Sequence, residues 1–531
     1  MTEMSGADSL VELLRLRALE QPDQLALVFL PDGSTSKQES WTYGELFSRA
    51  GAVALRLRRE DRTTKPVVLA LRPGLTFVAA LFGGWMAGAT VVPTAPPLNR
   101  RTAERLRSIA QDCRPGTILV DEDLRGRALH CASALAAVPA ATWCVLDTSG
   151  TGHTDEVQAA DPAMIQYSSG STGEPKGVLL THANLISNCV VLGHHIGTEA
   201  DRVGLSWLPP YHDMGLIGTI MLAVHGGWPL VMMTPEHFVQ DPTRWLRAIT
   251  EFEVTITVAP NFAFALCAEH VTDEEVVALD LSSLRQVFCG SEPVSAATLT
   301  AFRERFTPAG YDERSLIPCY GLAEATLFVT GKAAGSEITL APNGEVVSCG
   351  TVAIGHELAV TDESGAPLPD GEIGEIRVRG PNVATGYHGR PELTRRTFGA
   401  DGWLRTGDLG CLRNGELFVT GRASDLMIVA GRNLYPQDVE ESVLRNHPPV
   451  RRAVAFGIMT QDAEELVVMA EVRDVEDAAR LVSAITATVA TLHGVRPADV
   501  VLLPAGAIPV TTSGKVRRNP ARDSYLAGVA S

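Results

Sequence analysis

Residues 168–177 read S-S-G-S-T-G-E-P-K-G, and this stretch decides the fold and the site that we expect. Short apolar segments, at 163–167 and from 178 onward, flank it. Glycines let a backbone approach a ligand closely, while backbone N–H groups, hydroxyls and a lysine can surround an anion. The stretch therefore predicts a polyphosphate-binding loop with the candidate residues Ser168, Ser169, Gly170, Ser171, Thr172, Gly173 and Lys176.

An ordinary Ser/Gly turn in a hairpin is the alternative interpretation of the same ten residues. The Walker A pattern G-x-x-x-x-G-K-[ST] is absent, and Gly177 stands where a hydroxyl would hold magnesium. The density of glycines and hydroxyls, together with the motifs further along the chain, favours the ligand loop.

Composition excludes several classes of protein. The formal net charge is −17, which argues against nucleic acid, because phosphate-backbone binding needs clustered basic residues. Nine scattered cysteines without metal-site spacing, and an N-terminus without a basic and apolar leader, predict a reduced, cytoplasmic protein. Two of the five lysines fall inside candidate site motifs; the five are Lys37, Lys65, Lys176, Lys332 and Lys515.

Strand patterns alternate with helix patterns through the first 331 residues. Two uncharged stretches, 73–99 and 214–235, are broken by prolines and glycine pairs, so we expect a buried helix followed by a strand in each and no membrane span. The alternation predicts the α/β class with two doubly wound parallel sheets. Residues 1–421 would form the large N-terminal domain, with a small β-barrel-like subdomain from about 332, and 427–531 a small α+β C-terminal domain.

Two motifs follow apolar strands and carry groups able to act in chemistry. Residues 207–216 read W-L-P-P-Y-H-D-M-G-L, in which His212 and Asp213 could perform acid–base work or form a structural pair in a turn. Residues 289–293 read C-G-S-E-P, for which a plain turn at a strand end is the default interpretation.

Four further motifs lie downstream. Residues 319–326 read C-Y-G-L-A-E-A-T and could simply begin a helix, while 403–410 read W-L-R-T-G-D-L-G. Residues 421–436 contain G-R-A-S-D and G-R-N-L-Y-P, and 510–518 read V-T-T-S-G-K-V-R-R. Alone, these last three would be read as turns or a basic solvated tail.

The order and spacing of all these motifs resemble the adenylate-forming superfamily of acyl-CoA synthetases, luciferases and peptide-synthetase adenylation domains. The resemblance covers nearly the whole chain. The strings L-P-P-Y-H-D-M-G-L, Y-G-L-A-E-A-T and G-R-N-x-Y-P-Q-D look like the fatty acyl-AMP ligase branch in particular.

The resemblance implies a role for each motif. Gly290, Ser291 and Glu292 would pack beside adenine, while His212 would line the acyl carboxylate pocket. Tyr320, with Gly321, would stack on adenine, and Glu324 would bind Mg²⁺. Asp408 and Arg422 would bind the ribose hydroxyls. Lys515 would be the catalytic cation for the α-phosphate and the carboxylate. The threonine of the usual Y-G-x-T-E is replaced by Ala323.

The resemblance also implies a hinge at 422–426, about which a mobile domain of residues 427–531 rotates. Relatives carry Asp or Lys at the pivot, and here Ser424 takes that place. The cofactors would be ATP and Mg²⁺, and the product an acyl-adenylate formed from a carboxylic, fatty acid with release of pyrophosphate.

The acceptor thiol stays open between an acyl carrier protein and CoA. The branch passes its acyl group to the phosphopantetheine of a carrier protein, but only residues 331–348 stand where its members usually carry an insertion. Pairs of arginines at 451–452 and 517–518 are hypothesised to dock an acidic carrier. A non-catalytic binding module is disfavoured by intact Lys176, Glu324, Asp408 and Lys515, and no pattern supports oxygenase chemistry. The length of the acid depends on residues 210–330, including Trp228 and Phe262, whose orientation the sequence leaves open.

Overall fold

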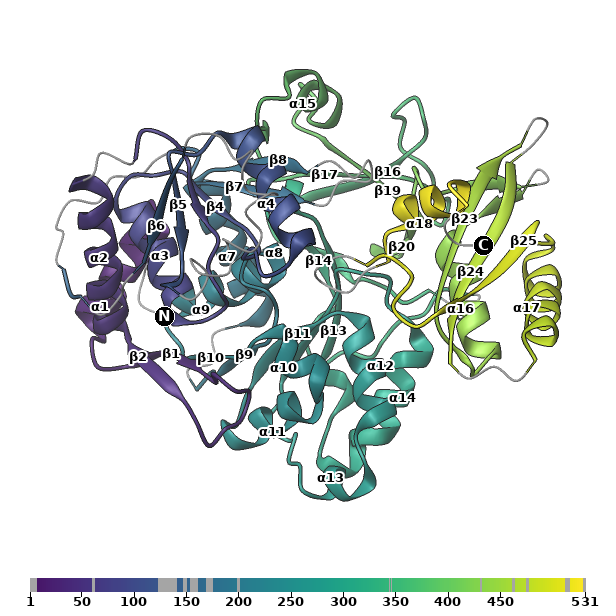
Figure 1. The fold of residues 1–531 in the computed structure, drawn as a ribbon, viewed down its shortest axis with the longest axis horizontal. Coiled ribbons are helices and arrows are strands. Elements are labelled where there is room, and N and C mark those ends of the chain that lie inside the picture. Colours follow the sequence, from purple (N-terminus) through teal and green to yellow (C-terminus); the bar gives the residue numbers. More distant parts are fainter. Residues whose placement is uncertain are drawn as a thin grey trace.

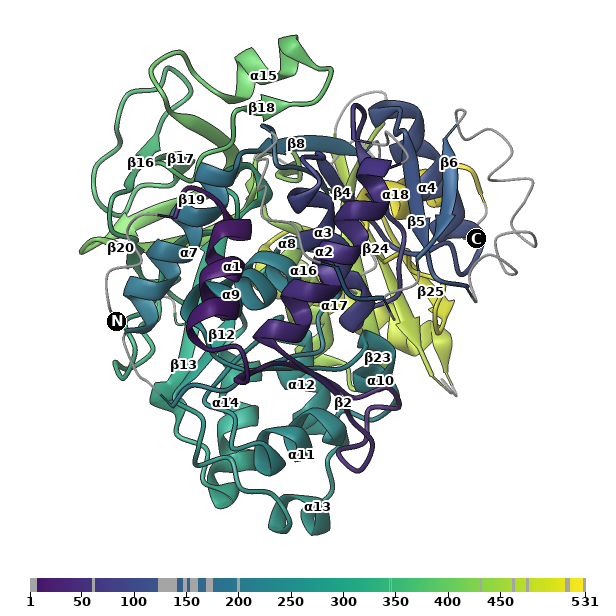
Figure 2. The same ribbon diagram turned by 90° about the vertical axis from the view of Figure 1, so that its left-hand side faces the viewer.

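Three β-sheets position the functional motifs. The structure is a computed structural model, and it describes residues 7–59, 63–122, 141–146, 150–152, 161–168, 175–197, 201–342, 344, 346–429, 432–460, 464–473, 477–510 and 516–528. Two of the sheets fill the larger part of the molecule, and the third stands to one side of it beyond β20 (Figures 1 and 2).

The seven-stranded sheet contains, next to one of its edge strands, the two strands that flank the glycine-rich stretch. Its order is β18 (Gly386–Tyr387), β8 (Lys176–Leu180), β7 (Met164–Ser168), β4 (Val91–Pro93), β3 (Val67–Leu69), β5 (Thr117–Val120) and β6 (Thr142–Val145). The five strands from β7 to β6 are parallel. Strand β8 pairs antiparallel with β7, and β18 pairs antiparallel with β8. The central strands are apolar and buried on both faces, as expected of parallel strands covered on both sides.

The long sheet has thirteen strands, of which a parallel half carries the motifs at 204–216 and 286–293. Its order is β16 (Glu357–Thr361), β17 (Gly374–Arg379), β19 (Leu404–Arg413), β20 (Glu416–Arg422), β15 (Thr351–Val352), β14 (Phe328–Gly331), β13 (Leu316–Gly321), β12 (Gln286–Cys289), β11 (Ile256–Ala259), β9 (Gly204–Ser206), β10 (Leu230–Met232), β1 (Leu25–Phe29) and β2 (Glu39–Thr42). The strands of the predicted β-rich subdomain are hydrogen-bonded onto this sheet through β14, β15 and β20. The subdomain therefore prolongs the parallel half.

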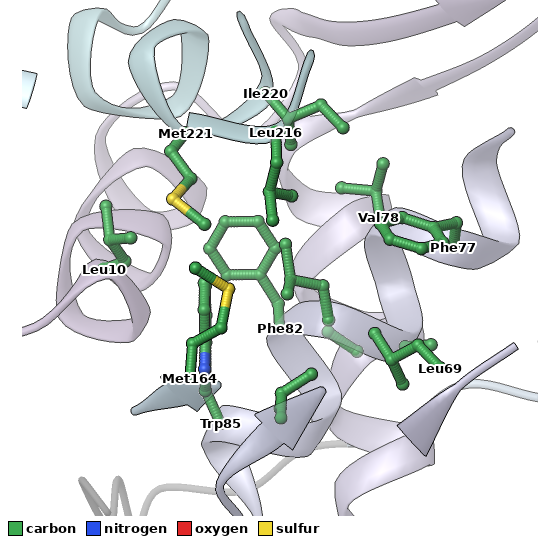
Figure 3. Packing of buried hydrophobic residues seen from close by; sticks show 14 of the residues in the cluster. Leu10, Leu69, Phe77, Val78, Phe82, Trp85, Met164, Leu216, Ile220 and Met221 are labelled. Carbon is green, nitrogen blue, oxygen red and sulfur yellow. The ribbon is translucent and has the colours of Figure 1, made fainter. Parts of the chain in front are cut away.

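Helices fill the space between the two large sheets. They are α1 (Leu10–Glu20), α2 (Tyr43–Arg59), α3 (Leu75–Met86), α7 (His182–Ile196) and a run of α8 (Asp213–Gly215), the π-helix η1 (Leu216–Met221) and α9 (Leu222–Gly226). Figure 3 shows how Phe82 of α3 lies among Trp85, Met164 and residues of η1 in this core. Thr42 caps α2: its hydroxyl accepts from the Glu45 amide, and the Glu45 carboxylate accepts from the Thr42 amide.

Outer helices cover the remaining faces of the large sheets. Helix α4 (Arg100–Cys113) packs on the seven-stranded sheet. The long sheet is covered by α10 (Pro235–Gln240), α11 (Thr243–Glu251), α12 (Asn261–His270), α13 (Asp273–Val277), α14 (Ala296–Phe306) and the 3-10 turns η2 (Thr307–Ala309) and η3 (Glu313–Ser315). Helix α15 (Pro391–Thr397) contacts β18 and β19.

The third sheet belongs to the C-terminal part of the chain. It contains β22 (Arg432–Leu434), β21 (Met427–Val429), β24 (Glu464–Val472), β23 (Val450–Met459) and β25 (Asp499–Pro504). Helices α16 (Pro436–Asn446) and α17 (Ala478–His493) pack in one apolar cluster on this sheet, and α18 (Arg518–Leu526) belongs to a second. This part has its own cores, separate from those of the large sheets.

The predicted α/β class is confirmed. Both uncharged stretches fold as a helix followed by a strand, and among the described residues no helix combines the length and apolarity that crossing a membrane requires. The cysteines of the described part are free thiols, and all except Cys319 are buried, as is usual for thiols that act as small apolar side chains. The domain limits at 421 and 427 and the hinge stay predictions.

Candidate active site

One cleft of about 1130 Å³ collects most of the predicted site residues. Its walls come from both large sheets and from the C-terminal part of the chain, which supplies Glu441 and Arg517 among others. The predicted residues that line it are Ser168, Lys176, His212, Ser291, Glu292, Tyr320, Gly321, Glu324, Asp408 and Arg422. Segments more than two hundred residues apart therefore meet at one place.

The two strands that flank the glycine-rich stretch bring its ends, Ser168 and Lys176, to the cleft. Ser168 at the end of β7 pairs with Lys176 at the start of β8, in antiparallel register, and both line the cleft. The backbone carbonyl of the preceding residue, Tyr167, accepts from Arg105 Nη2 at 3.2 Å, so α4 holds this edge from the outside. The predicted residues Ser169, Gly170, Ser171, Thr172 and Gly173 lie outside the described residues, as does Lys515.

Asp408 is the buried centre of a polar network that includes the partly exposed Arg422. Its Oδ2 accepts from the Tyr320 hydroxyl at 2.7 Å, and its Oδ1 accepts from Arg422 Nε at 2.9 Å. The three residues stand on β13, β19 and β20, and Asp408 and Arg422 are direct partners in the strand register. Burial raises the pKa of Tyr320 well above its ordinary value, and Asp408 raises it further, so the phenol keeps the proton that it donates.

This network fixes the direction of a carboxylate toward the cleft. Asp408 is 6% exposed and lines the cleft, while its charge raises the pKa of Arg422. A carboxylate oxygen has more than one acceptor site, so Asp408 can accept further donors such as two ribose hydroxyls. The geometry suits the role that the resemblance implies.

Glu324 lies in the 3-10 turn η4 (Ala323–Ala325) that follows β13. Its Oε1 accepts from the Tyr387 hydroxyl at 2.7 Å, and its backbone carbonyl accepts from the Ala384 amide at 2.9 Å. Burial raises the pKa of Tyr387, and the Glu324 carboxylate raises it further. Tyr387 thus orients the carboxylate that is predicted to hold Mg²⁺.

The turn after β12 needs its glycine for packing. A Cβ on Gly290 would lie 2.8 Å from Cys319 Sγ and 2.9 Å from the Cys319 carbonyl, so the two strand ends can approach only because it is absent. Gly290 itself is not among the lining residues, whereas Ser291, which has φ +73°, and Glu292 are. Glu292 Oε1 accepts from the Phe262 amide at 2.6 Å.

His212 and Asp213 form a pair at the entry to the helical run. His212 Nδ1 and Asp213 Oδ1 are 2.7 Å apart, and both residues line the cleft. The backbone carbonyl before them, on Tyr211, accepts from Gln166 Nε2 at 3.1 Å, which ties this turn to β7. The sequence analysis offered a His212–Asp213 pair as one alternative, and the structure contains this pair. It faces the predicted carboxylate pocket.

Arg518 links the predicted hinge to the C-terminal part. Its guanidinium pairs with both oxygens of Glu440, at 2.9 and 2.7 Å, and with Asp425 Oδ2 at 3.1 Å. Burial lowers its pKa, but Glu440 and Asp425 outweigh that effect and raise it. Ser424, in the place of the pivot, donates to Asp425 Oδ1 at 2.9 Å.

The arginines hypothesised to dock a carrier protein are mostly engaged in ion pairs. Arg451 pairs with Glu269 at 2.6 Å, Arg452 with Glu471 at 3.2 Å, and Arg518 with Glu440. Among the described residues, Arg517 has no carboxylate partner within ion-pair distance, and it lines the cleft close enough to Arg105 to lower the pKa of Arg105 further, after burial. The basic groups that line the cleft outside these ion pairs thus include Arg517, Arg105 of α4 and Lys176.

Sequence reasoning missed several residues of this site. Tyr387 and Arg105 lie outside the sequence motifs that were assigned roles. Asp425 lies within the motif at 421–436 but was assigned no role there. Tyr387 is 63 positions from the carboxylate that it orients. An aromatic hydroxyl in a turn-rich region carries no local signal, so only the fold could reveal it.

The apolar arm of the cleft completes the geometry. Beyond His212 the lining residues are apolar or small and come from strands β9–β12, from η1 and α9, and from α7; they are Leu192, Gly204, Leu205, Gly218, Leu222, Trp228, Leu230, Ile256, Val258 and Phe288. A charged polar end therefore opens into an apolar arm within a single cleft.

The fold and this cleft define an adenylate-forming enzyme, and the chain belongs to the AMP-binding enzyme family. Residues 14–388 match the family described as AMP-binding enzyme, and residues 424–530 match the AMP domain of the Disco-interacting protein 2-like family. The superfamily predicted from the motifs is thereby confirmed.

Named relatives narrow the class. The chain is 36% identical to medium-chain-fatty-acid–[acyl-carrier-protein] ligase JamA of Moorena producens, over 98% of this chain and 95% of the relative. It is also 36% identical to long-chain-fatty-acid–AMP ligase FadD32 of Mycolicibacterium smegmatis, over 95% of this chain and 92% of that one. Both are similar to this protein along nearly their whole length.

Solved structures agree. The fatty acid AMP ligase from Legionella pneumophila matches with a TM-score of 0.75 and 34% identity, covering 100% of this chain and 98% of its own. A structure from a study of fatty acyl-adenylate ligases of E. coli and L. pneumophila matches with a TM-score of 0.88 and 30% identity, covering 99% of both chains. The resemblance to the fatty acyl-AMP ligase branch is confirmed.

Proposed function

We propose that this protein joins a fatty acid to AMP, using ATP, and then transfers the acyl group to the phosphopantetheine thiol of an acyl carrier protein. The observation that carries the proposal is the single cleft in which the Asp408 network and Glu324 at a polar end open into an apolar arm. A nucleotide and a fatty acid need those two environments side by side.

The first step forms a bond between a carboxylate oxygen and the α-phosphorus of ATP. The bond from that phosphorus to the pyrophosphate oxygen breaks, and pyrophosphate leaves with its electron pair. The protein must hold two anions together and orient them, because no covalent nucleophile is required. In the second step the thiol sulfur attacks the acyl carbon, its proton is released, and AMP leaves.

Named residues would perform the binding. Asp408 and Arg422 would hold the ribose, Tyr320 and Gly321 would face the base beside Ser291 and Glu292, and Lys176 would meet the phosphates. Lys515 is proposed as the cation that meets the α-phosphate and the acyl carboxylate, and residues 427–531 as the unit that turns about 422–426. The location of the protein in the cytoplasm stays a prediction.

A Mg²⁺ ion fits the carboxylate that the cleft presents. Within the described ranges no group of three or more His, Cys, Asp or Glu side chains forms a metal site. A single carboxylate such as that of Glu324 suits Mg²⁺, which is bound through one or two carboxylates together with substrate phosphates. Glu324 would hold the ion, which when bound neutralises phosphate charge.

CoA is the second candidate for the acceptor. In the structure β14 ends at Gly331 and β15 begins at Thr351, and the connection contains two isolated antiparallel bridges, Leu340 to Val347 and Ser295 to Val346. This short connection stands where the branch usually carries its insertion, and that observation favours CoA.

Two measurements test the proposed function. Acid-dependent exchange of labelled pyrophosphate into ATP, across a panel of fatty and aryl acids, tests adenylation. Transfer to a holo carrier protein, followed by intact-mass analysis, is then compared with thioester formation on CoA. A carrier adduct is the expected result; acylation of CoA alone would replace the carrier proposal with the CoA alternative.

A further inference from the structure

The far end of the apolar arm lies at a defined row of the long sheet. Leu230 of β10, Gly204 of β9 and Ile256 of β11 are strand neighbours in register, and each is the first residue of its strand. All three line the cleft. The cleft therefore extends along the strands, from their carboxyl ends near Phe262 to their first residues.

Trp228 closes the arm just beyond this row. It lines the cleft two residues before β10, and its Nε1 lies 3.5 Å from where a Cβ on Gly204 would be. The ring folds across the end of α9, since a Cβ on Gly226 would come within 1.6 Å of it. The backbone carbonyl of Trp228 accepts from the Tyr43 hydroxyl at 3.1 Å, so the wall is anchored.

A buried charge stands behind the ring. The guanidinium carbon of Arg202 lies 5.1 Å from the centroid of the Trp228 ring, and Arg202 is 2% exposed. Arg202 donates to the side chain of Gln286 and, at 3.1 Å, to the Ile196 carbonyl. An alkyl chain that passed the ring would meet this hydrogen-bonded cation, which is an unfavourable neighbour for apolar surface.

The distance along the strands sets the chain length. From Ile256 to Asn261, which also lines the cleft, the chain advances five residues at about 3.3 Å each, or roughly 16 Å. An extended alkyl chain with bonds of about 1.5 Å advances roughly 1.3 Å per carbon. The arm thus accommodates up to about twelve carbons.

We propose that Trp228 terminates the acyl-chain arm and limits the substrate to fatty acids of no more than about twelve carbons, that is, to medium-chain acids. The inference rests on the proposed function, because it assigns the length of the acid that the cleft adenylates. Trp228 acts as a specificity residue at the end of the substrate and takes no part in the chemistry.

The test is the chain-length profile of kcat/KM in acid-dependent pyrophosphate exchange, measured from C6 to C18. In the wild type, kcat/KM should rise about fourfold per added methylene up to the limit, as burial of a methylene predicts, and then fall. Trp228→Ala should move the maximum by two or more carbons toward longer acids, and Trp228→Phe by less.

Two further variants keep the test decisive. A Cβ on Gly218, which lines the arm, would lie 3.0 Å from Leu327 Cδ2, so Gly218→Leu should narrow the arm and move the maximum toward shorter acids even if Trp228→Ala does not fold. Trp143→Ala is the matched control, because Trp143 of β6 is 37% exposed and lies outside the cleft lining. Its profile should equal that of the wild type.

The outcomes separate the two proposals. A shift to longer acids in Trp228→Ala supports the inference, and so does a shift to shorter acids in Gly218→Leu if Trp228→Ala does not fold. A wild-type maximum at long-chain or aryl acids, a folded Trp228→Ala with the wild-type profile, or an unchanged profile in Gly218→Leu overturns it while adenylation stands. Absence of exchange with every acid overturns the proposed function itself, and the inference with it.

Discussion

The two ends of the cleft are built in opposite ways. At the polar end, Asp408 is held between a neutral phenol and a guanidinium, so a charged acceptor is pre-oriented before any ligand arrives. At the apolar end, Trp228 closes an arm of small and aliphatic side chains, and the nearby cation of Arg202 is kept behind the ring. We propose that one end recognises the nucleotide by directed hydrogen bonds, and the other recognises the fatty acid by the available length.

This difference teaches how one cleft can bind two unlike molecules. Hydrogen bonds to charged groups are directional and are lost when a single partner is removed. Apolar burial is roughly proportional to area, so it changes gradually with the number of methylenes. Substitutions at the polar end should therefore change kcat and the KM for ATP. Substitutions at the apolar end should change which fatty acid is preferred.

The largest effect is expected from Lys515→Ala at the polar end. Removing the cation proposed to meet the charge that develops at the α-phosphate should lower kcat for adenylation on the order of 10²–10³-fold. Single-turnover formation of acyl-hydroxamate in the presence of hydroxylamine measures it. The chain-length profile of the residual activity should match that of the wild type; a rate within threefold of the wild type would contradict the assigned role.

Asp408→Ala should come next. It removes the carboxylate between Tyr320 and Arg422, and charged hydrogen bonds of this kind are worth about 1.5–3 kcal/mol, or roughly 10–150-fold. We expect that factor in the KM for ATP, with the KM for the fatty acid within about threefold, from steady-state pyrophosphate release. An equal change in both KM values would mean that the two ends are not independent.

Acid should destabilise the layer behind the apolar end. His182 of α7 and His225 of α9 are partly or wholly buried, and burial lowers the pKa of each from 6.5 to about 4. Neither ring nitrogen of His182 has a hydrogen-bond partner in the described part of the chain, and its ring packs edge-on against Trp85. Both rings must therefore stay neutral in the folded protein.

The sign follows from proton linkage. Between pH 6.5 and 4 the unfolded chain binds protons that the folded chain refuses, so stability is full above pH 6.5 and is lost as the pH falls. At pH 5 each histidine should cost about 2 kcal/mol of unfolding free energy. Between pH 7.5 and pH 5, the free energy of unfolding of His182→Leu, measured with urea, should fall by about 2 kcal/mol less than that of the wild type. Equal losses in both proteins would show that His182 is not the titrating group.

The smallest effect is expected away from both ends. Glu357 forms an exposed ion pair with Arg379 at 2.6 Å on the outer strands β16 and β17. Exposed pairs are screened by solvent and contribute little, so Glu357→Gln should leave the urea midpoint of unfolding close to that of the wild type. Its kinetic constants should equal those of the wild type, which makes it the background against which the other variants are compared. A change in the kinetic constants would mean that β16 and β17 are coupled to the cleft.

The polar end could be predicted largely from the sequence. Lys176, Glu324, Asp408 and Arg422 lie in short strings, and the structure brings all four to one cleft. Phosphate and ribose recognition use a few groups at fixed backbone positions, so a local pattern can reveal them. Their individual roles stay predictions.

The apolar end could not be predicted in the same way. Its lining comes from α7, η1, α9 and four strands, each of which contributes one to three residues with the same apolar character as the core. The sequence pointed to Trp228 as a candidate, but only the register of Leu230, Gly204 and Ile256 places it at the end of the arm. Which apolar residue faces a cavity is decided by packing between distant segments.

The fold shows the same division. Alternating strands and helices predicted the two large sheets, because burial and periodicity are local properties. That the β-rich strands join the long sheet through β14, β15 and β20 depends on edge pairing between residues such as Thr351 and Glu416, 65 positions apart, and no local pattern encodes it.

The central claim is that a fatty carboxylate attacks the α-phosphorus of ATP in this cleft. Incubating the protein with ATP, hydroxylamine and decanoate labelled with ¹⁸O in its carboxylate tests the claim directly, since the bridging oxygen should remain with AMP after acyl transfer. The account predicts AMP carrying one ¹⁸O, seen by mass spectrometry, and unlabelled pyrophosphate. Unlabelled AMP beside newly formed acyl-hydroxamate, or formation of ADP with label in phosphate, would contradict it.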